Sequence, residues 1–121
     1  MGTKDFGGLG EDLAVRLMES QGMEILERNL HIGKMGELDI VAMDGETLVF
    51  CEVKCKHGNQ ELGGFQAINY AKQQQVKRLA RAYLVSFEGE FRYCRFDAVE
   101  VVVDSEGRTE PVVNQLKDAW R

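Results

Sequence analysis

The sequence has few of the residues that mark exported, zinc-binding or membrane proteins. Its three cysteines include no C-x-x-C pair, and its two histidines have no partners at the spacing of a zinc site. Neither a disulfide framework nor a zinc site is therefore expected. There is no run of about 18 apolar residues, and the first residues lack the apolar core of a signal peptide. We expect a cytoplasmic protein with reduced thiols and no membrane partner.

An excess of basic residues is also missing. Fifteen lysines and arginines stand against 20 aspartates and glutamates, which gives a net charge of −5. This balance excludes a globally basic nucleic-acid binder of the histone type, but it leaves room for a local basic site. With 121 residues, an ordinary globular composition and no linker or repeat, the chain is expected to form a single domain over residues 1–121.

Hydrophobic periodicity and turn residues predict the order of the elements. Apolar residues recur at helical spacing after the glycines at 7, 8 and 10, and Gly22 stands where a helix C-cap glycine belongs. After Pro111 only an edge strand or a short segment is expected. The predicted elements are a helix over 9–21, a strand over 23–31, a β-hairpin over 37–55, a helix over 65–86 and a strand region over 91–104.

The hairpin carries the clearest signal, because two β-rich runs flank Asp44-Gly45. We expect these two residues to form the loop, which fixes the pairing of the strands. A four-residue loop keeps the same pairs, whereas a three-residue loop would turn Glu52 away from Asp39. The predicted pairs are Met43 with Glu46, Phe50 with Asp39 and Glu52 with Glu37.

Both faces of this hairpin are mainly apolar, which is the pattern of a sheet covered on both sides by helices. Four charged groups interrupt one face at the end far from the turn. Carboxylates on a half-buried face repel each other and cost several kcal/mol unless they are paired or bind a metal ion. The charged face shows Glu37, Asp39, Val41, Met43, Leu48, Phe50, Glu52 and Lys54, and the other shows Leu38, Ile40, Ala42, Val49, Cys51, Val53 and Cys55.

Asp39, Glu52 and Lys54 together favour a metal site over a surface ion-pair cluster in which Lys54 neutralises Glu52. Asp39 and Glu52 are diagonal neighbours in the predicted register, about 7–8 Å apart between backbones and within side-chain reach of one atom. Ligands that are all oxygen suit Mg²⁺ or Mn²⁺. Lys54 follows on the same face, where it can hold or polarise a metal-bound water.

The two helices add further candidates. Lys72 lies near the middle of the apolar stripe of the second helix, where it either snorkels to an edge or reaches toward the carboxylates. Lys77, Arg78 and Arg81 lie on the opposite face of that helix, which is typical of a solvated surface. Glu11, near the start of the first helix, is typical of an acid favoured by the helix dipole.

Four short motifs of the sequence occur in the same order as the motifs of a known protein family. They are Gly10-Glu11 before a helix, Gly36-Glu37-Leu38-Asp39-Ile40-Val41, Val49-Phe50-Cys51-Glu52-Val53-Lys54, and Ala67-Ile68 followed by Lys72. In these residues the chain resembles the YraN family, small bacterial proteins often labelled as endonucleases. The resemblance runs over residues 7–103 and a closing stretch over 112–120.

The resemblance implies a fold and a superfamily. It points to the PD-(D/E)XK nucleases, near the archaeal Holliday-junction resolvases. The implied α/β fold is restriction-endonuclease-like: a mixed central sheet, with the hairpin over about 37–55 at its heart and helices on both faces.

The resemblance also implies roles for the residues of the site. Asp39 and Glu52 would bind Mg²⁺ (or Mn²⁺), helped by the main-chain carbonyl of Val53. Lys54 would orient the attacking water. Whether Glu11 or a neighbouring glutamate, Glu37, is the auxiliary acid stays open. The implied catalytic set is Asp39, Glu52, Lys54, Glu11 and Lys72.

The predicted function is metal-dependent hydrolysis of phosphodiester bonds in DNA or a branched nucleic acid. The alternatives are a non-catalytic nucleic-acid-binding module of a larger complex, and a protein-interaction domain with a vestigial acidic cluster. A homodimer would double the basic patch, although the sequence shows no clear interface for one. The candidates for phosphate contacts are Lys56, His57, Lys77, Arg78 and Arg81, together with Lys54, Lys72, Arg28 and Lys34.

Overall fold

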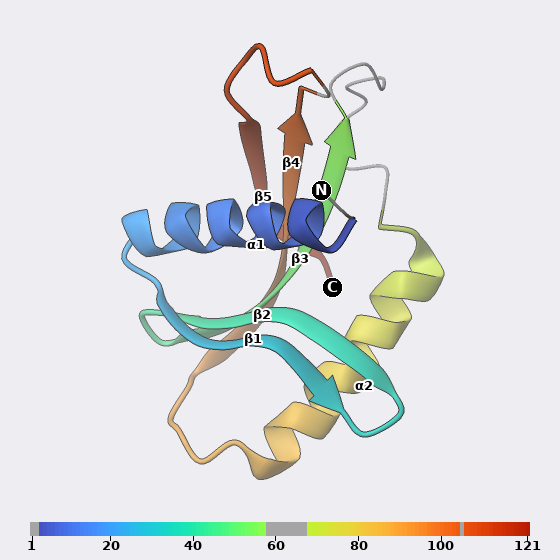
Figure 1. Cartoon of the computed structure of the whole chain (residues 1–121). Coiled ribbons are helices and arrows are strands. Elements are labelled where there is room, and N and C mark those ends of the chain that lie inside the picture. The colour runs from blue at the N-terminus through green and yellow to red at the C-terminus, as the bar shows by residue number, and fades with distance from the viewer. Residues whose placement is uncertain (1–2, 58–67, 105) are drawn as a thin grey trace.

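The sheet of this protein is mixed, and its strand order follows the order of the chain (Figure 1). The computed structural model describes residues 3–57, 68–104 and 106–121, with side chains from residue 8 onward. Within these ranges the neighbouring strands are antiparallel except β3 and β4, which are parallel and joined through α2. The elements are α1 (Thr3–Ser20), β1 (Glu24–Ile32), β2 (Gly36–Asp44), β3 (Thr47–His57), α2 (Tyr70–Ser86), β4 (Tyr93–Val103) and β5 (Val112–Trp120).

The two helices cover opposite faces of the sheet, as the sequence predicts (Figure 1). α1 buries Ala14 and Met18 in one apolar cluster, and α2 buries Val76 and Leu79 in another. The strand β3 is central and contributes to both clusters. This arrangement confirms the α/β class and fits a restriction-endonuclease-like sheet with the hairpin at its centre.

The β2–β3 hairpin has the predicted two-residue loop at a different place. Met43 lies opposite Leu48 and not opposite Glu46, so Asp44 still belongs to the strand and the loop is Gly45-Glu46. Gly45 has a φ of 61°, and a type II′ turn requires a glycine at its first central position. The predicted register is therefore wrong by two residues. The residues that are paired across the hairpin keep their predicted faces, because the side-chain period of a strand is also two.

Strands β2 and β3 separate beyond their last pair, Ile40 with Cys51 (Figure 1). From there β3 runs on beside β4, and β2 runs on beside β1. The next residues on the separating strands are Asp39 and Glu52. The predicted pairs of Phe50 with Asp39 and of Glu52 with Glu37 are therefore wrong: Phe50 faces Val41.

Beyond this separation β2 turns toward α2. Leu38 was expected on the same face of the sheet as Ile40, but it is buried on the α2 face, in the cluster that contains Leu79. Gly36 has a φ of 143°, and a Cβ on it would lie 2.7 Å from the Gln75 Nε2 atom. A strand segment released from one neighbour is free to twist further, which explains why Leu38 breaks the face alternation.

The helix α1 ends as predicted and begins earlier than predicted. Gly22 has a φ of 87°, and the Met23 N–H donates to the Met18 carbonyl at 3.1 Å, as in a Schellman cap. The helix begins at Thr3, so the glycines at 7, 8 and 10 lie inside it. A Cβ on Gly10 would lie 2.0 Å from the Cys55 sulfur, so Gly10 lets α1 approach β3 closely.

The helix α2 begins later than the predicted residue 65, which lies outside the described residues. Its N-cap is Asn69, whose side chain accepts the Lys72 N–H at 2.9 Å. The predicted helix over 65–86 included Ile68 in its apolar stripe. This is wrong, because Ile68 precedes the helix. An Asn side chain that satisfies a free N–H of the first turn is a stronger start signal than apolar spacing.

One further expectation from the sequence is confirmed. After Pro111, β5 is an edge strand. Cys51, Cys55 and Cys94 are free thiols. In the described part of the chain, no helix combines the length and the apolar character needed to cross a membrane.

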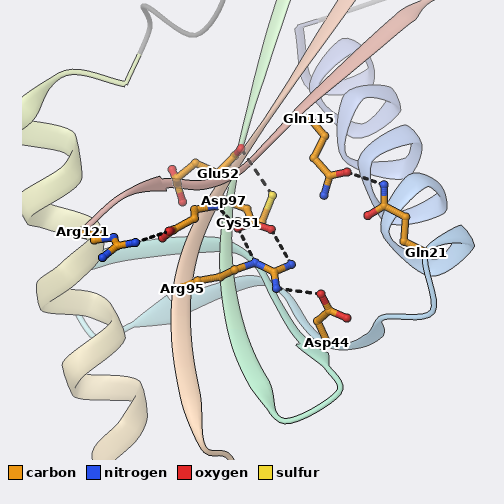
Figure 2. Close-up of polar contacts among 9 residues, drawn as sticks. Gln21, Asp44, Cys51, Glu52, Arg95, Asp97, Gln115 and Arg121 are labelled. Carbon is orange, nitrogen blue, oxygen red and sulfur yellow. Dashed lines mark hydrogen bonds and ion pairs between the residues drawn. The ribbon is translucent and has the colours of Figure 1, made fainter.

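A buried ion-pair network ties the hairpin and β5 to β4 (Figure 2). Arg95 donates to both Asp97 carboxylate oxygens, at 2.9 and 3.1 Å, and lies 2.8 Å from Asp44 at the hairpin tip. Asp97 is fully buried and also accepts the Asp118 N–H at 3.0 Å. Asp118 has a φ of 53°, so this bond holds a backbone conformation that few residues adopt.

We predict that Asp97→Ala lowers the free energy of unfolding by about 3 kcal/mol. The change removes the carboxylate that accepts two hydrogen bonds from the mostly buried Arg95 guanidinium, and it leaves the Asp118 N–H without its acceptor. Urea denaturation measures the loss. The control Glu106→Ala removes an exposed ion pair with Arg108 and should cost less than about 1 kcal/mol. Equal losses in the two variants would contradict this role for Asp97.

Candidate functional site

The predicted metal-site residues meet where β2 and β3 separate. They line a pocket of about 360 Å³, here called the fork pocket. β2 supplies one acid, β3 supplies a second acid and a lysine, and the N-terminal end of α2 closes the third side. The lining residues are Asp39, Glu52, Val53, Lys54, Ile68, Asn69 and Lys72.

Asp39 bridges the two separating strands. Its Oδ2 atom accepts the Val53 N–H at 2.9 Å, so a carboxylate takes the place that a β2 carbonyl would have in a continuous ladder. Burial raises the pKa of the Asp39 carboxyl above its usual value, although the Val53 hydrogen bond and the charge of Lys72 lower it. The strand backbone thus fixes one acid of the fork pocket.

Glu52 is the acid with the least favourable surroundings. It is 4% exposed, and its Oε2 atom has no hydrogen-bond partner among the described residues. Burial, and then the charge of Asp39, raise the pKa of the Glu52 carboxyl to about 7. Lys72 lies 3.4 Å from Oε1 and opposes this rise without overcoming it. A buried oxygen without a partner next to a second acid is a site with room for a cation.

The two lysines of the fork pocket are placed differently. Lys72 reaches the carboxylates instead of snorkelling away from them, and its Nζ also donates to the Gln75 side chain at 3.4 Å. Lys54 is exposed. Glu52 therefore has Lys72 as its ion-pair partner, which differs from the surface cluster in which Lys54 neutralises Glu52.

Two further acids approach Asp39 from α1 and β2. Carboxylate oxygens of Glu11, Glu37 and Asp39 all lie within 4.8 Å of one another. Glu11 accepts the Asn29 side-chain N–H at 2.6 Å, and burial raises the pKa of its carboxyl. Glu37 lies 3.6 Å from the His31 Nε2 atom. The structure thus brings both candidates for the auxiliary acid to Asp39.

Two of the expected phosphate contacts on β1 and β3, Arg28 and Lys56, are paired with acids of the protein. Lys56 Nζ lies 3.2 Å from the buried Glu100 carboxylate. Arg28 lies 2.7 Å from Asp12 on α1. His57 is exposed at the end of β3. None of these three residues lines the fork pocket.

Apart from Lys72, the expected phosphate contacts on α2 lie away from the fork pocket. Lys77 donates to the Arg121 main-chain carbonyl at the end of β5. Arg78 and Arg81 are exposed on the helix surface, as the sequence predicts. Lys77 and Arg81 line a separate pocket with Phe50.

Sequence reasoning missed Glu100, a buried carboxylate opposite Lys54 in the β3–β4 register. Its side chain is 2% exposed, and its contact with Lys56 is an ion pair without hydrogen-bond geometry. The signal was present as a single acid in the apolar run Val99-Glu100-Val101. A charged residue at the centre of such a run needs a buried partner.

Comparison with known proteins places the chain in a family. Residues 10–101 match the model of "Uncharacterised protein family UPF0102". The chain belongs to the UPF0102 family. A UPF0102 protein of Magnetococcus marinus is 42% identical over 119 residues, which cover 97% of this chain and 95% of that protein. UPF0102 proteins of Chlorobium chlorochromatii and Nocardia farcinica are both 38% identical, over 98% and 92% of this chain and 92% and 85% of their own lengths.

The UPF0102 match contains the whole fork pocket and both neighbouring acids. It begins just before Glu11 and ends just after Glu100. Chemically, this arrangement can hold a divalent cation between oxygen ligands and can place two ammonium groups beside it.

We predict that Glu52→Gln stabilises the metal-free protein more at pH 8 than at pH 5. Between its ordinary pKa of 4.5 and the folded value of about 7, folded Glu52 keeps a proton that the unfolded chain has released. Stability therefore falls as the pH rises through this window and stays low above it. Glutamine is neutral throughout, so its advantage should grow by up to about 3 kcal/mol.

Urea denaturation in EDTA at both pH values measures this difference. Glu46→Gln is the matched control, because Glu46 is exposed in the hairpin loop and should show no such change. An effect of Glu52→Gln that is the same at pH 5 and pH 8 would show that the carboxylate is not strained by its burial.

Proposed function

We propose that this protein is a Mg²⁺-dependent nuclease of the PD-(D/E)XK type, which hydrolyses phosphodiester bonds in DNA or a branched nucleic acid. Mn²⁺ would substitute for Mg²⁺. The observation that carries the proposal is the buried Glu52 carboxylate, with one oxygen lacking a described partner beside a second acid in an open pocket. A cation there removes the repulsion between the acids and supplies the missing partner.

The ligands of the proposed site suit this ion. Asp39 and Glu52 offer carboxylate oxygens, and Mg²⁺ prefers one or two of these together with several waters. The N–H of Val53 points to Asp39 across the separated strands. The N–H and C=O of one strand residue point to the same side, so the Val53 carbonyl is directed there as well. A bound Mg²⁺ supplies Lewis-acid polarisation of the phosphate and lowers the pKa of a bound water.

The lysines would perform the steps around the scissile phosphate. Lys54 is exposed on the same strand as Glu52, where it would hold the attacking water and take part in its deprotonation. Lys72 now pairs with Glu52. When Glu52 becomes a metal ligand, the Lys72 ammonium would turn to a phosphate oxygen and stabilise the charge that develops on it.

The acids on the other side of Asp39 would have a supporting role. Glu11 and Glu37 place oxygens close to the Asp39 carboxylate. They would accept hydrogen bonds from the ordered waters that complete the coordination of the ion. In this proposal both are auxiliary acids, and neither replaces Glu52.

We predict that labelled single-stranded, duplex, flapped and four-way DNA will reveal cleavage with Mg²⁺ or Mn²⁺, and that Lys54→Ala will lower its rate about 10²- to 10⁴-fold. Lys54→Ala should leave Mn²⁺ binding unchanged, because the lysine is not a ligand. Gel assays under single-turnover conditions measure the rate, and Mn²⁺ electron paramagnetic resonance measures binding. Lys117→Ala, which changes an exposed lysine on the edge strand β5, is the control.

Two outcomes would reject the nuclease. Cleavage that survives in both Lys54→Ala and Glu52→Gln would not depend on the fork pocket. Mn²⁺ and DNA binding without cleavage of any substrate would favour the non-catalytic nucleic-acid-binding module instead.

A further inference from the structure

Aromatic and basic residues are mixed where the chain enters β4, in the run Phe91-Arg92-Tyr93-Cys94-Arg95-Phe96. Phe91 is 42% and Tyr93 is 59% exposed, and the Arg92 side chain is 70% exposed. The fork pocket uses none of these residues. Exposed rings between cations are a pattern of surfaces on which unpaired bases stack.

Two adjoining pockets lie along the first residues of β4 and form what is here called the β4 groove. Their volumes are about 500 and 280 Å³, and they share Cys94, Phe96 and Arg121. The first extends to Tyr93 and Trp120, and the second passes along α2 to its basic residues. Pockets of roughly 300–1,000 Å³ hold small organic groups, so the groove is large enough for a nucleotide.

Stacked rings make the floor of the β4 groove rigid. Phe96 stacks on Trp120 with ring centroids 5.4 Å apart and planes at 18°, and Phe50 lies 5.8 Å from Phe96. The Trp120 side chain is almost fully buried, and its Nε1–H finds no acceptor among the described residues. A preformed aromatic floor lowers the entropy cost of binding a flat ring.

The rim of the β4 groove has basic side chains that can bind a phosphate group. Lys77 and Arg81 line it from α2, and Arg121 lines it from the end of β5. Arg121 pairs with Asp118, but the Arg121 side chain is 87% exposed and that of Asp118 is 44% exposed. Arg92 pairs with Glu46, and both of these side chains are exposed as well. Such exposed pairs contribute little, so a phosphate can replace the carboxylate as the partner.

The part of the β4 groove that Phe50 lines is on the same face of the sheet as the fork pocket, and the part that Tyr93 lines continues to the edge of β4 beyond its last pair with β5. Phe50 lines the groove, and Glu52 follows two residues later on the same face of β3, about 7 Å along the strand. The helix α2 borders both, with Lys72 at the fork pocket and Arg81 at the groove. One extended nucleic-acid strand can therefore contact both places.

We propose that the β4 groove binds a single-stranded segment of nucleic acid, with a base stacked on Tyr93 and phosphates on Arg81 and Arg121. The inference rests on the proposed function and deepens it, because it names the substrate as one with unpaired nucleotides next to the scissile bond. A base inside a duplex is stacked on both faces and presents no free face to Tyr93. A single strand is therefore bound here in preference to a duplex.

Fluorescence anisotropy in EDTA tests this binding without any cleavage. The probes are a labelled oligothymidylate of about 12 nucleotides and a hairpin duplex of the same length. The expected results are tighter binding of the single strand, a loss of about tenfold or more in Tyr93→Ala, and near-normal affinity in Tyr93→Phe, which keeps the ring. Thermal melting shows that both variants fold.

The charge contribution is tested with a matched pair of arginine variants. Arg81→Gln should weaken binding and reduce the steepness of its salt dependence. Arg16→Gln removes the same charge from the exposed surface of α1, on the opposite face of the sheet, and should change neither. Equal effects of the two variants would show that binding depends only on the overall charge of the protein, and this would overturn the proposed groove.

Other results separate this inference from the proposed nuclease. The groove is overturned if the single strand does not bind, if the duplex binds more tightly, or if Tyr93→Ala binds as the wild type does. DNA cleavage together with Tyr93-independent binding rejects the groove and keeps the nuclease. Tyr93-dependent binding without cleavage of any substrate keeps the groove and rejects the nuclease.

Discussion

The hydrogen bond from the Val53 N–H to Asp39 is the contact on which the candidate site depends. It spans the place where β2 leaves β3, and it lets the two strands separate without leaving a buried N–H unpaired. The separation opens the fork pocket in the middle of a sheet that both helices cover. Without it, Asp39 and Glu52 would sit in a continuous ladder with no room for a ligand. The backbone therefore both creates the pocket and orients its first acid.

The second acid carries an electrostatic cost that the protein does not remove. Glu52 is buried beside Asp39, and its only described counter-charge is the ammonium of Lys72, which is itself half exposed. Compare Asp97, a fully buried acid that receives both an arginine fork and a backbone N–H. Two of the three buried acids of the described sheet, Asp97 and Glu52, thus have opposite surroundings, and the third, Glu100, has Lys56 as an ion-pair partner. Complete satisfaction is typical of a structural role, and incomplete satisfaction is typical of a ligand site.

The sequence could predict the faces of the hairpin better than its pairs. Faces depend only on whether the loop has an even number of residues, so the paired residues keep their predicted faces although the loop is Gly45-Glu46 and not Asp44-Gly45. The type of turn decides which residues pair, and the hydrophobic periodicity of the strands does not reveal the turn type. The separation of β2 from β3 and the Lys56–Glu100 pair depend on contacts across β4 and α2. Those contacts join residues distant in the sequence, which residue patterns along one strand do not reveal.

The most direct test of the account is to locate a metal ion in crystals of the protein grown with Mn²⁺, using anomalous diffraction. The account predicts one peak between the Asp39 and Glu52 carboxylates, at about 2.1–2.2 Å from an oxygen of each, with the Lys72 ammonium displaced from Glu52. A peak held only by Glu11 and Glu37, or no peak in the fork pocket while Glu52 keeps its contact with Lys72, would contradict it.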